Sequence, residues 1–98
     1  MRKENAYQST LIKKLEERFP DAIVLKNDPS YLQGIPDLTI FERDRWATLE
    51  TKRSAKATHQ PNQDHYVEKM DSMSFSRFIC PENEEEVLHD LEQALHKV

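Results

Sequence analysis

Apolar residues near the start of the chain recur at intervals of three and four, which is the spacing of one helical face. Four residues make up this stripe: Leu11, Ile12, Leu15 and Phe19. Charged and polar residues fill most of the positions between them, and Pro20 with Asp21 interrupts the pattern. The pattern predicts an amphipathic helix over residues 3–18.

The middle of the chain changes to the two-residue alternation that is typical of strands. Residues 22–26 are a short apolar run rich in β-branched residues, which predicts a buried strand. Residues 36–42 and 45–52 read as two further strands around a turn at residues 42–45. In the first of them Leu38 and Ile40 alternate with residues that point to the opposite face.

The second half of the chain predicts two helices around one strand. After the polar and irregular stretch 53–60, Pro61 and Asn62 open a helix that continues to about residue 70. Residues 74–80 form a strand that Pro81 ends. Asn83 is a natural N-cap for the last helix, and Glu86 three residues later suggests a capping box. The last helix has an apolar stripe of Val87, Leu88, Leu91 and Leu95.

The predicted order αβββαβα indicates an α/β (α+β) fold, with a mixed central sheet flanked by helices. The 98 residues suffice for a single domain spanning residues 1–98. With 33% charged residues and 37% hydrophobic ones, the core is lean, and we expect a homodimer to cover part of the surface. The net charge of −4 excludes a uniformly basic nucleic-acid surface, although Lys52, Arg53 and Lys56 form a local basic group.

Cysteine content and hydropathy place the chain inside the cell. The single cysteine, Cys80, has no partner for an internal disulfide. No apolar run approaches the roughly 20 residues that a bilayer span needs, and the first ten residues lack the apolar region of a signal peptide. We expect a cytoplasmic protein with no membrane partner.

The predicted hairpin brings acidic residues of both strands together. If the turn is centred between Arg43 and Asp44, residues whose numbers sum to 87 face one another, so Asp37 lies opposite Glu50. Opposed side chains share one face, with Cβ atoms ~5 Å apart. Lys52, two residues after Glu50, emerges on the same face.

Two carboxylates at this distance repel each other unless a positive group lies between them. A divalent cation with oxygen ligands fits best, and we expect Mg²⁺, for which Mn²⁺ can substitute, held by Asp37, Glu50 and the backbone carbonyl of Thr51. Lys52 is then placed to hold or deprotonate an attacking water, or to stabilise the charge of a phosphate. The first helix offers a further acid: Glu4 points within ~35° of the apolar stripe, with Glu16 as the alternative.

Three short segments together resemble the motifs of the PD-(D/E)xK nuclease superfamily. They are Gly34-Ile35-Pro36-Asp37, Glu50-Thr51-Lys52, and Gln63 at the start of a helix. Within the superfamily the chain is most similar to the small stand-alone VRR-NUC nucleases and to archaeal or phage Holliday-junction resolvases. The resemblance implies a restriction-endonuclease-like core and a Mg²⁺-dependent endonuclease that acts on branched DNA and leaves 5′-phosphate and 3′-hydroxyl ends.

The resemblance also implies a role for each matching residue. Asp37 and Glu50 match the metal ligands, Glu4 matches the helix acid, and Lys52 matches the catalytic lysine. Gln63 matches the glutamine that steadies the site, and Gln60 is the alternative for that role. Family resolvases work as symmetric dimers, and the small size and the Pro-Asn-Gln helix opening resemble phage or prophage nucleases.

The basic group and its neighbourhood are the expected DNA-binding residues, namely Arg53, Lys56 and Gln60. Two rival hypotheses remain beside the nuclease. One is a non-catalytic module with a nuclease-like fold that binds nucleic acid or a protein. The other is an acidic interaction protein that uses its last helix to contact a partner.

Overall fold

The computed structural model describes the backbone of residues 3–96 and the side chains of residues 5–96. The elements are α1 (Lys3–Arg18), β1 (Ile23–Lys26), β2 (Leu38–Glu42), β3 (Arg45–Thr51), α2 (Pro61–Met73), β4 (Phe75–Ile79) and α3 (Glu84–Leu95). This confirms the predicted order αβββαβα. Within the described part of the chain, no helix combines the length and the hydropathy needed to cross a bilayer.

The four strands form one mixed sheet in the order β1-β2-β3-β4. The first three strands are antiparallel to their neighbours, and β4 runs parallel to β3. Helix α2 is the crossover that this parallel pair requires. The hairpin register is the predicted one, because Leu38 pairs with Leu49 and Phe41 with Trp46. Its two-residue turn needs a left-handed residue, which Arg43 supplies with φ of 58°.

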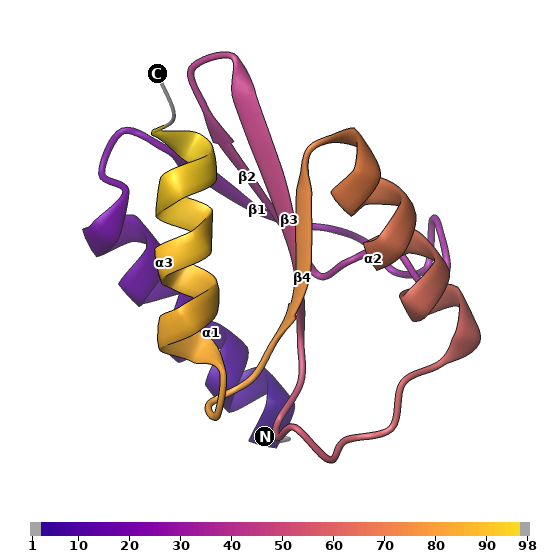
Figure 1. The fold of residues 1–98 in the computed structure, drawn as a ribbon. Helices are drawn as coiled ribbons and strands as arrows, with labels where there is room; N and C mark the ends of the chain where they lie inside the picture. Colours follow the sequence, from indigo (N-terminus) through magenta and orange to yellow (C-terminus); the bar gives the residue numbers. More distant parts are fainter. Residues whose placement is uncertain (1–2, 97–98) are drawn as a thin grey trace.

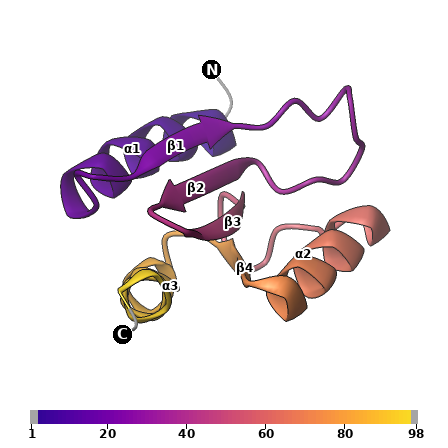
Figure 2. The ribbon, with the colours of Figure 1, turned by 90° about the horizontal axis from the view of Figure 1, so that it is seen from above.

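Helices cover both faces of the sheet. Figures 1 and 2 show α1 and α3 side by side on one face, and α2 on the other face over β3 and β4. The main core lies between the sheet and the α1–α3 layer, and its residues are Leu11, Leu15, Phe19, Leu38, Ile40, Ala47, Leu49, Phe75, Ile79, Val87, Leu88, Leu91 and Leu95. The apolar stripes predicted for the first and the last helix, α1 and α3, therefore face this core.

Strand β1 differs from its prediction, because it is exposed rather than buried. Ile23 is 60% exposed and Leu25 is 47% exposed. The strand lies at the edge of the sheet, where β2 is its one strand neighbour among the described residues. Helix α1 covers the face that carries Val24, and α2 covers the opposite face only over β3 and β4 (Figure 2). The apolar composition was read correctly as a strand, but its place at the edge leaves half of its side chains in water.

The expected capping box of the last helix is also wrong. Asn83 occupies the N-cap position of α3, but its side chain makes no capping hydrogen bond. Its Oδ1 accepts a hydrogen bond from the Cys80 amide at 2.8 Å, and its Nδ2 donates to the Phe78 carbonyl at 3.1 Å. The side chain thus satisfies backbone groups at the end of β4, where the ladder stops.

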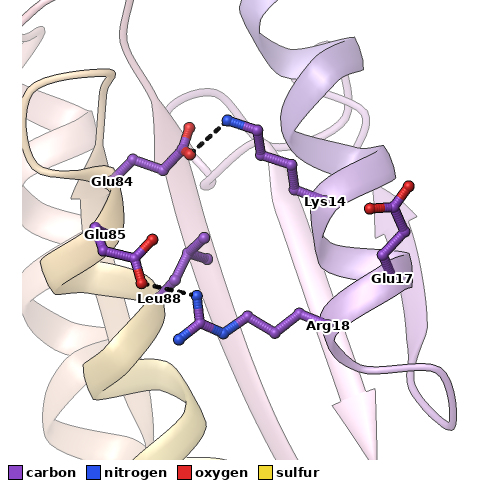
Figure 3. Close-up of a pocket in the computed structure, with 6 residues that line it drawn as sticks. All are labelled: Lys14, Glu17, Arg18, Glu84, Glu85 and Leu88. Atoms are coloured by element: carbon purple, nitrogen blue, oxygen red, sulfur yellow. Dashed lines mark hydrogen bonds and ion pairs between the residues drawn. The ribbon is translucent and has the colours of Figure 1, made fainter.

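Ion pairs tie the first turn of α3 to α1 along a groove of about 370 Å³. Lys14 Nζ lies 2.7 Å from Glu84 Oε2, and Arg18 Nη1 lies 3.1 Å from Glu85 Oε1 (Figure 3). Tyr7 also donates its hydroxyl to Glu84 at 2.9 Å, and burial together with this bond raises the pKa of Tyr7. The acidic start of α3 is therefore a docking segment for α1 as well as a favourable end for the helix dipole.

A substitution in the core tests the α1–α3 layer. Leu91 is completely buried, and we expect Leu91→Ala to lower the free energy of unfolding by about 2–5 kcal/mol because it leaves a cavity. The exposed His89 in the same helix is the control, and His89→Ala should change stability by less than about 0.5 kcal/mol. Urea denaturation followed by circular dichroism measures both, and equal stability of the two variants would contradict this packing.

Candidate active site

The end of β3 carries charged residues where an apolar strand end would pack more favourably. β3 lies between β2 and β4, so its last residues are covered on both sides. Glu50 is 1% exposed and Lys52, just after the strand, is 7% exposed. Burial of two charged groups is costly unless each is paired or hydrogen-bonded. The neighbouring residues must therefore satisfy both.

The side-chain amide of Gln63 satisfies both charges at once. Its Nε2 donates to Glu50 Oε2 at 2.9 Å, and its Oε1 accepts from Lys52 Nζ at 2.7 Å. Lys52 Nζ also donates to the Thr58 carbonyl at 3.1 Å and lies 4.0 Å from Glu50 Oε2. An amide has a donor end and an acceptor end, so it can bridge an anion and a cation without adding charge.

Gln63 is held in place by the start of α2. It is the third residue of this helix, and its Oε1 also accepts a hydrogen bond from the backbone N–H of Gln60 at 3.0 Å. This bond satisfies one of the amides that a helix N-terminus leaves free. Gln60 is exposed, and in this structure it positions Gln63 through its backbone. Of the two glutamines considered, Gln63 is the one that reaches Glu50 and Lys52.

Asp37 approaches the same strand end from β2. Its Oδ2 accepts from the Thr51 backbone N–H at 3.1 Å and from Thr51 Oγ1 at 2.6 Å. Continuation of the β2–β3 ladder would direct this N–H to the Pro36 carbonyl, but that carbonyl accepts from Asn27 Nδ2 at 2.8 Å instead. The carboxylate of Asp37 thus takes over the position of a backbone acceptor at the end of the sheet.

Helix α1 reaches the site through a residue that the sequence analysis did not identify. Gln8 Nε2 donates to Thr51 Oγ1 at 3.1 Å, so α1, Thr51 and Asp37 form a chain of hydrogen bonds. Gln8 comes four residues after Glu4, which is the spacing of one helical face. That spacing could have identified Gln8 as a neighbour of the site. Thr58 was also missed, because its contact with Lys52 uses a backbone carbonyl.

Among the remaining predicted residues, those with described side chains make no hydrogen bond to this network. The side chain of Glu4 lies outside the described residues. Its alternative, Glu16, is exposed two turns beyond Gln8, about 12 Å along the helix, so it does not fit the role of the helix acid. Arg53 and Lys56 are exposed on the loop that follows β3. Both side chains therefore lie in solvent on the loop that follows the end of β3.

The arrangement brings two carboxylates and one ammonium group to the end of one strand. Asp37 and Glu50 occupy the register position that follows the Leu38–Leu49 pair. Among the side chains of residues 5–96, no three His, Cys, Asp or Glu side chains form a group that could hold a metal ion. A cation at this position would therefore need ligands beyond these two carboxylates, from backbone carbonyls, water or substrate.

Comparisons of the chain with protein-family models, with curated proteins and with solved structures found no match. The chemistry of the site is therefore inferred from its own geometry and from the motifs of the sequence.

The bridging role of Gln63 can be tested through stability. We expect Gln63→Leu to lower the free energy of unfolding by about 1–3 kcal/mol, because it leaves Glu50 and Lys52 buried without the amide. Gln93→Ala, at an exposed glutamine of α3, is the matched control and should cost less than about 0.5 kcal/mol. Thermal and urea unfolding measure the difference, and a Gln63→Leu protein as stable as the control would disprove the bridge.

Proposed function

We propose that this protein is a Mg²⁺-dependent endodeoxyribonuclease that hydrolyses phosphodiester bonds of branched or otherwise structured DNA. One observation carries the proposal: Glu50 and Lys52 are buried at the end of the central strand and share the amide of Gln63, and Asp37 binds Thr51, the residue between them. The same residues carry the resemblance to the PD-(D/E)xK nucleases. The order αβββαβ, which that superfamily also has, supports the proposal further.

The donor atoms of the site fit Mg²⁺. The cation prefers hard oxygen ligands and often takes one or two carboxylates together with water and substrate phosphate. Asp37 and Glu50 supply the carboxylates. Alternate residues of a strand direct their backbone groups to the same neighbouring strand. The N–H of Thr51 points to Asp37 on the β2 side, so the carbonyl of Thr51 lies on that side too. Glu4 is the proposed further ligand. When bound, the ion supplies a Lewis acid for the phosphate oxygens.

Lys52 is held in a fixed position for the reaction. Two acceptors, Gln63 Oε1 and the Thr58 carbonyl, orient its ammonium group. An ammonium group fixed in this way can position the attacking water or stabilise the negative charge that develops on the phosphate. Water adds its oxygen to phosphorus, the bond from phosphorus to O3′ breaks, and O3′ takes a proton. The products carry a 5′-phosphate and a 3′-hydroxyl.

Exposed basic residues beside the site supply the proposed DNA contacts. Arg53 and Lys56 lie on the loop between β3 and α2, and Gln60 lies at the end of that loop. Basic side chains on an exposed loop can contact the phosphate backbone without reading sequence. The net charge of −4 then restricts DNA binding to this side of the protein.

A specific observation favours the alternative of a non-catalytic binding module. The Asp37 carboxylate is engaged by Thr51 and the Glu50 carboxylate by Gln63, so both acids already have structural partners. In a binding module these bonds would be their whole role. The two functions differ in one result, because a module of this kind binds DNA and leaves it intact in Mg²⁺ or Mn²⁺.

Conservative substitutions test catalysis. We expect Glu50→Gln and Asp37→Asn each to lower the rate of DNA cleavage by at least about 100-fold, because each removes one anionic ligand without changing the shape of the side chain. Asp44→Asn, in the exposed hairpin turn, should cleave like the wild type.

The measurement is cleavage of labelled junction, flap, single-stranded and duplex DNA in Mg²⁺. Full activity of the Glu50→Gln and Asp37→Asn proteins would rule out the proposed roles. A wild-type protein that cuts none of these substrates in Mg²⁺ or Mn²⁺ would favour the binding module.

The proposed enzyme is a homodimer, and the free edge of β1 suits a second copy. The Asn27 N–H donates to the Asp37 carbonyl at 2.8 Å, which continues the pairing of β1 with β2. By the alternation of an antiparallel ladder, Ile23 and Leu25 direct their backbone groups to β2, and Val24 and Lys26 direct theirs to the free edge. An edge of this kind is a template for another strand.

Two β1 strands can pair around a two-fold axis at Val24. In this register Ile23 of one copy lies opposite Leu25 of the other, so the most exposed apolar residues of the strand cover each other. The resulting sheet continues through both copies and keeps both sites accessible.

Charge on the β1 surface should prevent this association. We expect the double variant Ile23→Lys, Leu25→Lys to be monomeric at concentrations at which the wild type is a dimer, because it places like charges across the two-fold axis. Met73→Lys is the control, since Met73 is 65% exposed at the end of α2. Analytical ultracentrifugation gives the masses. A wild-type monomer, or a double variant that remains dimeric, would refute this interface.

A further inference from the structure

A second pocket, of about 470 Å³, lies beside the candidate active site. It lies between the β1–β2 loop and the start of α2. Its lining residues are Pro29, Gln33, Gly34, Gln60, Pro61, Asn62 and Gln63. Gln63 belongs to both places, because its amide also holds Glu50 and Lys52. The pocket and the catalytic groups are therefore separated by a single side chain.

The lining residues determine which class of ligand the pocket can bind. None of its residues is charged, so it offers no ionic side chain to a phosphate or a metal ion. The amides of Gln33 and Asn62 make no hydrogen bond within the described protein and remain available as donors and acceptors. Pro29 and Pro61 add apolar surface. A neutral ligand with an apolar ring and a polar edge fits this combination, and a nucleobase is the neutral part of DNA with these properties.

The loop wall of the pocket is fixed against α2. Gly34 has φ of 91°, and a Cβ atom at this position would lie 2.4 Å from the Cβ of Asn62. The loop therefore needs glycine both for its backbone conformation and for its close approach to α2. Before it, Asp28 Oδ1 accepts from the amide and the hydroxyl of Ser30, and these bonds lower the pKa of Asp28. A wall built in this way is ordered before any ligand binds.

We propose that this pocket takes one unpaired base of the DNA substrate, next to the phosphodiester bond that is cut. The inference rests on the proposed nuclease function and extends it to the choice of substrate. A base in a duplex is stacked and its Watson–Crick edge is occupied, so it reaches the pocket only when it is extruded. Extrusion costs least where pairing is already lost, as in a mismatch or a single-stranded segment. The pocket thus gives the site a preference for DNA with an unpaired base.

Abasic substitution tests the pocket without any cleavage. The probes are a labelled single strand and a labelled four-way junction, each with one abasic residue moved along the sequence, titrated in EDTA and followed by fluorescence anisotropy. We expect an abasic residue at one position to weaken binding by about 5- to 100-fold, which is the effect of losing one bound base. The double variant Gln33→Ala, Asn62→Ala should bind intact and abasic probes equally.

Gln93→Ala is the matched control, because this glutamine is exposed on α3 on the other face of the sheet, and it should keep the full abasic effect. If the double variant does not fold, Gln33→Ala alone decides, since Gln33 is an exposed loop residue without hydrogen bonds in the described structure. The inference is overturned if no abasic position matters, if the effect persists in the variants, or if neither probe binds.

Failure of this inference can be told apart from failure of the nuclease proposal. A protein that cleaves intact DNA in Mg²⁺ but shows no abasic effect lacks the base pocket and is still a nuclease. A protein that shows the abasic effect in EDTA but never cleaves has the pocket without the proposed chemistry.

Discussion

The burial of Glu50 and Lys52 beside a single amide is the constraint on which the rest of the site depends. Both side chains are buried, so the carboxylate of Glu50 needs a hydrogen-bond donor and the ammonium group of Lys52 needs an acceptor. A side-chain amide offers one of each. Gln63 provides them, and this fixes the start of α2 over the end of β3. The parallel crossover from β3 to β4 therefore does more than connect two strands, because it delivers the side chain that bridges Glu50 and Lys52.

A large part of this arrangement is predictable from the sequence. The register of the hairpin follows from the alternation of Leu38 and Ile40, since a slip of one residue would turn these side chains away from the core. The same register places Asp37 and Glu50 at one strand end. The resemblance to a family motif singled out Gln63 as a residue of the site. Its position in the first turn of α2 lets its amide reach Glu50 and Lys52. Local periodicity and short motifs carry this information because the contacts arise within one hairpin and its crossover.

The features that were not predicted depend on topology. An apolar strand such as β1 looks the same in sequence whether it lies at the centre or at the edge of a sheet, and its position here exposes Ile23 and Leu25. Asn83 has the right type and position for a helix cap, but the free backbone groups at the end of β4 take its side chain instead. The spacing from Glu4 marks the helical face of Gln8, but its contact with Thr51 depends on how α1 packs on the sheet.

The central claim is that Asp37 and the buried Glu50 hold a divalent cation for hydrolysis. Isothermal titration of Mn²⁺ into the wild-type protein, and into the Glu50→Gln protein under the same conditions, tests it most directly. The account predicts saturable binding to the wild type at millimolar or lower concentration, and loss of most of that binding in the variant, because one of the anionic ligands has become neutral. No uptake of Mn²⁺ or Mg²⁺ by the wild type, or equal uptake by both proteins, would contradict it.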